Sequence, residues 1–192
     1  MKKILIAIAV LLSGKIASAQ KELVTLDEHN KYIFYKVSET PGLPGDTLYN
    51  RLLRGLNQSK RFGKLKMDTK AGNNIAIKSS FLIYTSANLA KHEAGEVNYT
   101  LNAEVKEGKY RYWLTDFVFY PYERTRYGVY AKKPGVDYTF EQLKAKVGER
   151  EFSIYLDQIA KLGIEIGEQM TFYTADPEKK ATEPVKVDTK KW

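Results

Sequence analysis

The alternation of apolar and polar residues divides the chain into segments of different secondary structure. Residues Lys31 to Val37 (KYIFYKV) carry the β-branched and aromatic side chains that favour a strand. Pro41-Gly42-Leu43-Pro44-Gly45 ends this strand, and Asp46 is a good N-cap for a helix. Arg61-Phe62-Gly63 stops the helical pattern. Between these points leucines recur at helical spacing, at Leu48, Leu52, Leu53 and Leu56.

Four more strands are predicted, at Lys64–Thr69, Ile75–Tyr84, Val97–Val105 and Lys109–Tyr120. The first two flank Ala71-Gly72-Asn73, which is typical of a turn. The third alternates apolar with polar residues, so one of its faces is expected to be buried. Glu107-Gly108 connects it to the fourth and predicts a hairpin.

The remainder of the chain shows helical spacing. After a long loop, Pro121 to Tyr138, the pair Thr139 and Gln142 matches a capping box for a short helix at Phe140–Val147. A longer helix is predicted at Glu149–Phe172. Its apolar stripe is formed by Phe152, Tyr155, Ile159, Leu162, Ile166 and Met170.

The order strand, helix, four strands and helices predicts an α+β fold. We expect an antiparallel sheet of about five strands, with the helices on one face and the other face open. The sequence shows no internal repeat and no sign of a second domain, so residues 20–173 are predicted to form a single domain. Residues 174–192 contain five lysines and two prolines and are predicted to form a flexible tail.

The N-terminal residues have the pattern of a secretory signal. Lys2 and Lys3 precede an apolar run, Ile4 to Leu12, and Ala17-Ser18-Ala19 provides small residues for a signal peptidase. The apolar run is much shorter than the roughly 20 residues that span a bilayer. Residues 1–19 are therefore predicted to be a signal peptide, with no transmembrane segment after cleavage. We expect an exported protein, either periplasmic or at the cell surface or secreted.

Net charge and amino-acid composition restrict the classes of partner and of chemical site that the protein can have. The chain has a formal net charge of +8, which falls to +5 when cleavage removes Lys2, Lys3 and Lys15. A basic surface favours nucleic acids, but export argues against that partner. We favour the explanation that the charge aids solubility, or weak contact with acidic glycans or lipid headgroups. The chain has no cysteine, which excludes thiol nucleophiles and thiolate metal sites.

No motif assigns a catalytic, cofactor or metal site. The sequence lacks the Gly-x-Ser-x-Gly, Gly-Lys-Ser/Thr and His-Glu-x-x-His motifs and the glycine pattern of dinucleotide-binding proteins. The two histidines, His29 and His92, each lie in a predicted loop without a helical histidine partner, and the cluster Asp27-Glu28-His29 does not define a coordination geometry. We therefore predict no cofactor and no metal. Asp116 is the one acid of interest, because of its place in the hairpin.

Two registers of the hairpin place Asp116 on different faces of the sheet. Glu is poor at positive φ, which favours a type I turn with Gly108 in a left-handed bulge and Val105 paired with Lys109. This register puts on the open face Tyr110, Tyr112, Leu114, Asp116 and Tyr120. It puts in the core Trp113, Phe117 and Phe119. A slip by one residue would exchange the two groups and bury Asp116.

The segment Glu104 to Phe117 (EVKEGKYRYWLTDF), with the Asp46 helix before it and the terminal helix after it, resembles a known family. The family is an uncharacterised group of exported Bacteroidota proteins described as having a TBP-like fold. The resemblance covers Tyr32 to Met170, and Gly-Lys-Tyr-Arg-Tyr is its most recognisable part. It implies an α+β fold and a cell-envelope setting, and it assigns no catalytic residue. TATA-binding protein itself binds the DNA minor groove with its open sheet face, but a shared fold does not transfer that function.

Tyrosine and arginine gather in the second half of the predicted domain. Eight of the 14 tyrosines lie between Tyr99 and Tyr138. Both residue types are common in contact surfaces, although tyrosine is also an ordinary strand residue whose ring covers the sheet. The predicted partner-binding surface consists of Tyr110, Tyr112, Asp116, Tyr120, Arg124, Arg126, Tyr127 and Tyr130.

Two functions are consistent with these features. The first is a non-enzymatic binding or accessory module of the cell envelope that contacts an envelope protein or glycan through the open sheet face and the Tyr/Arg-rich loop. The second is an enzyme that acts on envelope glycans or polymers through Asp116, with Glu104 or a loop acid as its partner. The enzyme requires a concave pocket in which carboxylates converge.

Overall fold

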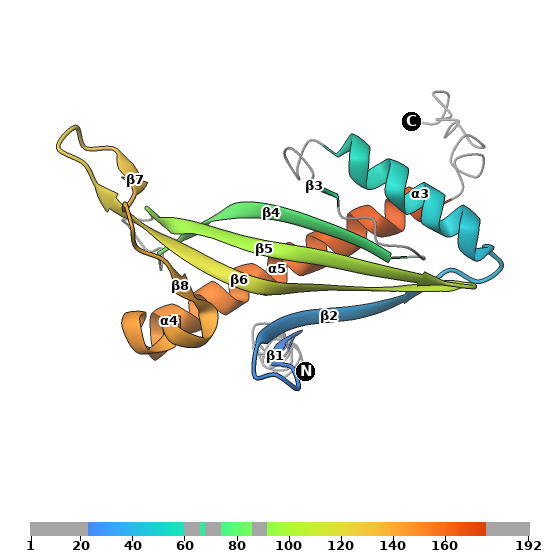
Figure 1. The fold of residues 1–192 in the computed structure, drawn as a ribbon, viewed down its shortest axis with the longest axis horizontal. Helices are drawn as coiled ribbons and strands as arrows, with labels where there is room; N and C mark the ends of the chain where they lie inside the picture. The colour runs from blue at the N-terminus through green and yellow to red at the C-terminus, as the bar shows by residue number, and fades with distance from the viewer. Residues whose placement is uncertain (1–22, 60–65, 68–73, 86–91, 176–192) are drawn as a thin grey trace, which may run out of the picture.

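The computed structural model describes residues 23–59, 66–67, 74–85 and 92–175 (Figure 1). The predicted signal peptide, the predicted turn at residues 71–73 and residues 176–192 of the predicted tail lie outside these residues. The strands are β1 (Val24–Leu26), β2 (Tyr32–Glu39), β3 (Lys66–Met67), β4 (Asn74–Tyr84), β5 (Glu93–Lys106), β6 (Lys109–Arg124), β7 (Tyr130–Lys132) and β8 (Tyr138–Thr139). The helices are α3 (Gly45–Gln58), α4 (Phe140–Val147) and α5 (Glu149–Thr174).

An open antiparallel sheet forms the body of the molecule (Figure 1). Its strand order is β1-β2-β6-β5-β4-β3, and both β7 and β8 pair with β6. Along β5, alternate side chains are buried beneath the helices, and those between them are only partly buried. The helices α3 and α5 contact each other and the same buried face. The predicted α+β fold, with helices on one face and the other face open, is confirmed.

The prediction of about five strands is too low, because the described residues form eight. Each of the five predicted segments contains a strand, and the three additional strands are short. β1 pairs with β2, while β7 and the first residue of β8 lie in the predicted loop Pro121–Tyr138. β6 continues into this segment as far as Arg124, so its backbone groups find partners there. The segment therefore has strand structure of its own.

The helix ends differ slightly from the predictions. α3 begins at Gly45, and its N-cap is Pro44 instead of Asp46. Asp46 lies in the first turn, where a carboxylate interacts favourably with the helix dipole. Thr139 is the N-cap of α4 as predicted, but its side chain makes no capping hydrogen bond. α5 continues to Thr174, the first residue of the predicted tail.

The hairpin between β5 and β6 has a two-residue turn. Lys106 pairs with Lys109, so Val105 faces Tyr110 instead of Lys109. Only Gly108 in this turn has a positive φ, of 65°. Its N–H donates to the carbonyl of Leu43 and its carbonyl accepts from the N–H of Thr40, at 3.2 and 2.8 Å. The connection between β2 and α3 therefore holds the tip of the hairpin. The favoured pairing of Val105 with Lys109 is wrong.

A β-bulge at Asp116 inverts the alternation of side chains along β6. Asp116 and Phe117 stand opposite one residue of β5, Tyr99. Asp116 has a φ of 55°, the left-handed conformation of the first residue of a G1 bulge. Beyond the bulge Phe117 and Phe119 are buried, as the favoured register predicts. Trp113, before the bulge, is only partly buried and is not a core residue.

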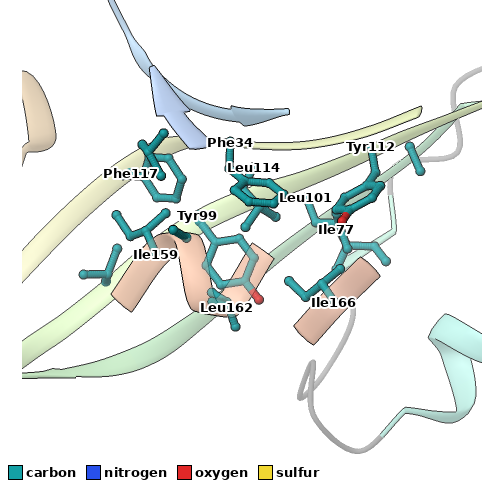
Figure 2. Close-up of a cluster of buried hydrophobic side chains, with 14 of the residues drawn as sticks. Phe34, Ile77, Tyr99, Leu101, Tyr112, Leu114, Phe117, Ile159, Leu162 and Ile166 are labelled. Atoms are coloured by element: carbon teal, nitrogen blue, oxygen red, sulfur yellow. The ribbon is translucent and has the colours of Figure 1, made fainter. Parts of the chain in front are cut away.

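The core lies between the sheet and α5 (Figure 2). The predicted stripe on α5 is confirmed, because all of its six residues are buried. Two glycines of α5 allow sheet side chains to reach the helix backbone. A Cβ at Gly163 would lie 2.6 Å from the ring of Phe34, and a Cβ at Gly167 would overlap the hydroxyl of Tyr112. The hydroxyl of Tyr112 donates to the carbonyl of Gly163 at 3.1 Å, so this buried polar group is satisfied.

Candidate functional site

Tyr110 and Tyr112 are core residues, which corrects their predicted place on the open face. Their side chains are 1% and 0% exposed. The hydroxyl of Tyr110 lies 3.3 Å from Oγ1 of Thr171, and that of Tyr112 is bonded to Gly163. Burial raises the pKa of Tyr112 well above its usual value, and nearby Tyr110 and Glu168 raise it further. The two-residue turn is the cause, because it shifts this half of β6 by one residue.

Asp116 remains near water, as the favoured register predicts. Its side chain is 50% exposed, and its Oδ1 lies 2.8 Å from Nζ of Lys31. The hydrogen bond to Asp116 is the main cause that raises the pKa of Lys31, and the charges of Asp116, Glu141 and Asp27 add to it. The carboxylate therefore interacts with a cation from the turn before β2.

The predicted pair of Asp116 and Glu104 is not assembled. Glu104 faces Arg111, five residues before Asp116 on β6, which corresponds to about 16 Å along a strand. Two carboxylates that cleave a glycosidic bond lie about 5–9.5 Å apart. Within the described part of the chain, no three His, Asp or Glu side chains are arranged to hold a metal ion.

Tyr120 belongs to a polar cluster at the far end of the open face. Nζ of Lys132 lies 4.3 Å from the centroid of the Tyr120 ring and 3.1 Å from Oε1 of Glu96. The hydroxyl of Tyr122 donates to the same carboxylate at 3.4 Å. Partial burial, followed by the charge of Glu96, raises the pKa of Tyr122. These contacts fix Lys132 over the Tyr120 ring and leave the ring only partly exposed.

The other predicted residues lie at a projecting hairpin between β6 and β7, which we call the arm (residues 124–130; Figure 1). The N–H of Thr125 donates to the carbonyl of Val129, and the N–H of Gly128 to that of Thr125. Tyr127 is 78% exposed, and the guanidinium of Arg126 lies 4.9 Å from its ring centroid. The arm also contains the exposed Arg124 and the partly buried Tyr130, and the ring of Tyr130 lies 4.7 Å from that of His92.

The open face carries a second group of aromatic and charged residues that sequence reasoning missed. We call it the open-face patch: Tyr35, Val37, Glu104, Arg111 and Trp113. Three neighbouring strands, β2, β6 and β5, place these side chains in two adjacent rows. Val37, Arg111 and Glu104 form one row, and Tyr35 and Trp113 begin the next. Tyr35 and Val37 are about half exposed.

Arg111 is the central residue of the open-face patch. Its guanidinium forms an ion pair with Glu104 and lies 5.5 Å from the centroid of the Trp113 ring. A hydrogen bond to Glu104, and then one to Tyr35, raises the pKa of Arg111. A hollow of 140 Å³ lies beside it, bordered by Tyr35, Val37, Glu104, Lys106 and Lys109. The patch therefore combines aromatic surface, a fixed cation and a small depression.

The signal that could have revealed the open-face patch was the turn. The alternative register of the hairpin exposes Trp113, and this is the register that β6 follows before Asp116. Trp113 and the arm lie at different places along β6. Arg124 is 11 residues beyond Trp113, about 36 Å in an extended strand. The open-face patch and the arm are thus separate surfaces, and the predicted site is not one surface because Tyr110 and Tyr112 are buried.

The open antiparallel sheet and its helices define an α+β protein of the TBP-like class. The predicted family resemblance is confirmed, because residues 34–120 match the family model described as "Domain of unknown function (DUF4468) with TBP-like fold". This match includes most of β2, all of α3, the turn between β5 and β6, and the open-face patch. It does not extend to α4 and α5.

Two solved structures share this fold. A DUF4468 family protein from Bacteroides ovatus ATCC 8483 is 17% identical in sequence to this chain, with a TM-score of 0.58. The alignment covers 84% of this chain and 94% of the Bacteroides ovatus protein. A TBP-like protein from Parabacteroides distasonis ATCC 8503 is 12% identical, with coverage of 78% and 96% and a TM-score of 0.58. At these identities the likeness shows the fold alone. No curated protein matches the chain. Among the described residues, no helix is long and apolar enough to cross a membrane.

Proposed function

We propose that this protein is an exported, non-enzymatic binding module of the cell envelope, and that it contacts an envelope protein or glycan through the open-face patch. The export part of the proposal rests on the signal-peptide pattern of residues 1–19. The binding part rests on one observation. The open face presents Trp113 and Arg111 in contact, bordered by Tyr35 and Glu104.

The composition of the open-face patch supports this role. Trp, Tyr and Arg are the residue types that contribute most to binding energy in protein interfaces. Arg111 is already held by Glu104 and Trp113, so a partner would not have to order a free side chain. A sugar ring could stack on the part of the Trp113 indole that stays exposed beside Arg111, while Glu104 and Arg111 offer hydrogen bonds.

The arm supplies a second contact in this proposal. Tyr127 and Val129 are 78% and 62% exposed at its tip, and Arg124 and Arg126 are beside them. Because the arm is a paired hairpin, it presents these side chains with little freedom of the backbone. Binding at both surfaces would require a partner that spans about 36 Å along β6.

Site-specific cross-linking in the native envelope tests the proposal. A photo-reactive amino acid replaces Tyr35 in the open-face patch, and a matched control replaces Lys78, which is exposed on β4. We expect one reproducible adduct from position 35 and none from position 78. Digestion of the adduct with protease or with glycan-degrading enzymes distinguishes a protein partner from a glycan.

Substitutions complete this test. W113A and R111A are expected to abolish the adduct, while thermal unfolding shows that the variants are folded. Equal cross-linking from positions 35 and 78, or an adduct that survives W113A in a folded protein, would overturn the proposal. Sequencing of the mature N-terminus tests export separately, and we expect Gln20 as its first residue.

A further inference from the structure

We propose that the arm binds the surface of an anionic lipid membrane and places the side chains at its tip among the lipid headgroups. The inference deepens the proposed function and rests on its export part, because export brings the chain to an envelope membrane. It does not rest on the open-face patch, which lies about 36 Å away along β6. A membrane, together with a protein or glycan attached to it, would extend over both surfaces.

The tip of the arm is exposed and projects from the end of the sheet, so it can reach a flat surface before the rest of that end does (Figure 1). We call four of its residues the arm tip: Arg124, Arg126, Tyr127 and Val129. Tyr127 and Val129 are 78% and 62% exposed and are the two most exposed large apolar side chains in the described part of the chain. The guanidinium of Arg126 lies 4.9 Å from the centroid of the Tyr127 ring.

The backbone of the arm holds these side chains in one place. The N–H of Thr125 donates to the carbonyl of Val129 at 2.8 Å, and that of Gly128 to the carbonyl of Thr125 at 2.9 Å. Gly128 has a φ of 80°, which closes the turn at no steric cost. A Cβ at Gly128 would lie 3.6 Å from Nη2 of Arg124, so this guanidinium also reaches the turn. The arm tip therefore presents two guanidinium groups beside two apolar side chains.

Positive charge without an acidic partner is found at the arm tip. Of the ion pairs in the part of the chain that the structure describes, none involves Arg124 or Arg126. The base of the arm differs, because its lysines are paired with glutamates: Lys132 with Glu96 at 3.1 Å and Lys133 with Glu123 at 3.7 Å. A third glutamate at this end of β5, Glu93, is partly buried. Attraction to an anionic surface therefore comes from the two arginines of the tip.

The combination of cationic and apolar side chains fits the boundary between lipid headgroups and acyl chains. Tyrosine is enriched at this boundary, because its ring is apolar and its hydroxyl is polar. Arginine forms charge-assisted hydrogen bonds with phosphate groups. An acidic glycan would match the arginines but would leave Val129 in water. A protein interface uses roughly 20–30 residues from each partner, far more than the arm tip offers.

The expected contact is weak and reversible. Polybasic segments that hold proteins on anionic membranes have about four to eight lysines or arginines, and the arm tip has two. Stable attachment to a membrane takes two signals. The open-face patch would supply the second signal when its own partner is attached to the same membrane. The arm would then orient the open face toward that partner.

Fluorescent labels and vesicles test the proposal. The chain has no cysteine, so V129C provides a single position for a fluorophore that responds to polarity. K78C, at an exposed position of β4, is the matched control. The protein is the chain from Gln20 onward, which contains every described residue. With vesicles of phosphatidylglycerol and phosphatidylcholine, we expect a blue shift from position 129 and none from position 78. Vesicles of phosphatidylcholine alone should give no shift at either position.

Substitutions identify the side chains that bind. R124Q/R126Q removes two charges from the arm tip, and the control K78Q/K161Q removes two charges from exposed positions elsewhere. Vesicle flotation should show a loss of binding of at least about tenfold for the first variant, and of less than about twofold for the control. Y127S keeps both arginines and should still weaken binding, because its ring no longer enters the interface.

Four results would contradict the proposal: equal shifts from positions 129 and 78, equal binding to both kinds of vesicle, unchanged binding of R124Q/R126Q, or an equal shift from position 129 with soluble polygalacturonate or glycerol phosphate. The last result would mean that the arm tip recognises anions without a membrane. The proposed function is tested by the adduct at position 35 and by the mature N-terminus. Its failure therefore gives a different result from failure of the membrane contact.

Discussion

Asp116 decides which side chains of β6 reach the core. With its φ of 55° it makes the bulge, so Tyr112 before it and Phe117 after it both face the helices. A regular strand would bury residues of one parity only. The sequence did not reveal the bulge, because no glycine marks it. Aspartate is one of the few residues other than glycine that tolerates this conformation.

Substitutions at Asp116 separate its backbone role from its charge. Asparagine also tolerates positive φ, so D116N should lose only the exposed ion pair with Lys31, which costs about 0–1 kcal/mol. Valine is strained there, so D116V should lower the free energy of unfolding by a further 1–3 kcal/mol, approximately. Urea unfolding measures both values. K31A is the control and should match D116N, whereas equal effects of D116N and D116V would show that the bulge is unstrained.

At the scale of elements, the predictability of the strands followed the clarity of their patterns. β5 alternates apolar and polar residues from Val97 to Lys106, and its buried face was predicted correctly. β6 carries large side chains at adjacent positions, such as Tyr112 and Trp113, so its alternation does not identify the buried face. Its register depended on the turn, and the turn depended on contacts of Gly108 with Thr40 and Leu43, which are remote in sequence.

The short strands of the predicted loop were hidden for a related reason. β7 and β8 have three and two residues, too few to show a period. β8 pairs with Val118 and Phe119, where β6 extends past its pairing with β2, which ends at Leu114. β7 pairs with Tyr122 to Arg124, where β6 extends past its pairing with β5, which ends at Pro121. Helices were easier to predict, because the apolar stripe of α5 repeats over about five turns, from Phe152 to Met170.

The close packing of α5 on the sheet makes a prediction about Gly167. Alanine is normally favoured over glycine in a helix by about 1 kcal/mol. Here its Cβ would overlap the hydroxyl of the fully buried Tyr112, so G167A should instead lower the free energy of unfolding by about 1–3 kcal/mol.

A double variant tests the cause of this effect. Y112F alone removes the hydrogen bond to Gly163 and should cost about 0.5–1.5 kcal/mol. In Y112F/G167A the missing hydroxyl makes room for the new methyl group. The double variant should therefore be more stable than the sum of the two single effects predicts. If the two substitutions had additive effects on the free energy of unfolding, the effect of G167A would not arise from overlap with the Tyr112 hydroxyl.

At the scale of the whole molecule, the fold assigns its two sheet faces to different roles. One face binds α3 and α5, and this division was predictable from the order of the elements. The composition of the open face was not, because it depends on the bulge and on the turn. Three of the eight predicted site residues, Arg126, Tyr127 and Arg124, lie exposed at the arm, while Tyr110 and Tyr112 stabilise the core.

The two buried tyrosines Tyr112 and Tyr155 make the stability of the whole domain sensitive to alkaline pH. Burial is the main cause that raises both pKa values, with the nearby residues Tyr110 and Glu168 or Glu151 adding to it. Unfolding lets the two hydroxyls titrate at their ordinary value of about 10. Below pH 10, approximately, both states keep these protons and the stability is fully present. Above it the unfolded state loses them first, so the free energy of unfolding should fall as the pH rises.

Urea unfolding between neutral and strongly alkaline pH measures this dependence. The variant Y112F/Y155F cannot lose these two protons, so its free energy of unfolding should fall less steeply above pH 10, approximately. Its stability at neutral pH should be lower, because Tyr112 no longer bonds to Gly163. F152L is the control: it perturbs the same core without a titrating group, so it should lower the stability equally at every pH. If the double variant and the parent lost stability with the same slope, the alkaline transition would arise from other groups, and burial of these hydroxyls would not couple folding to pH.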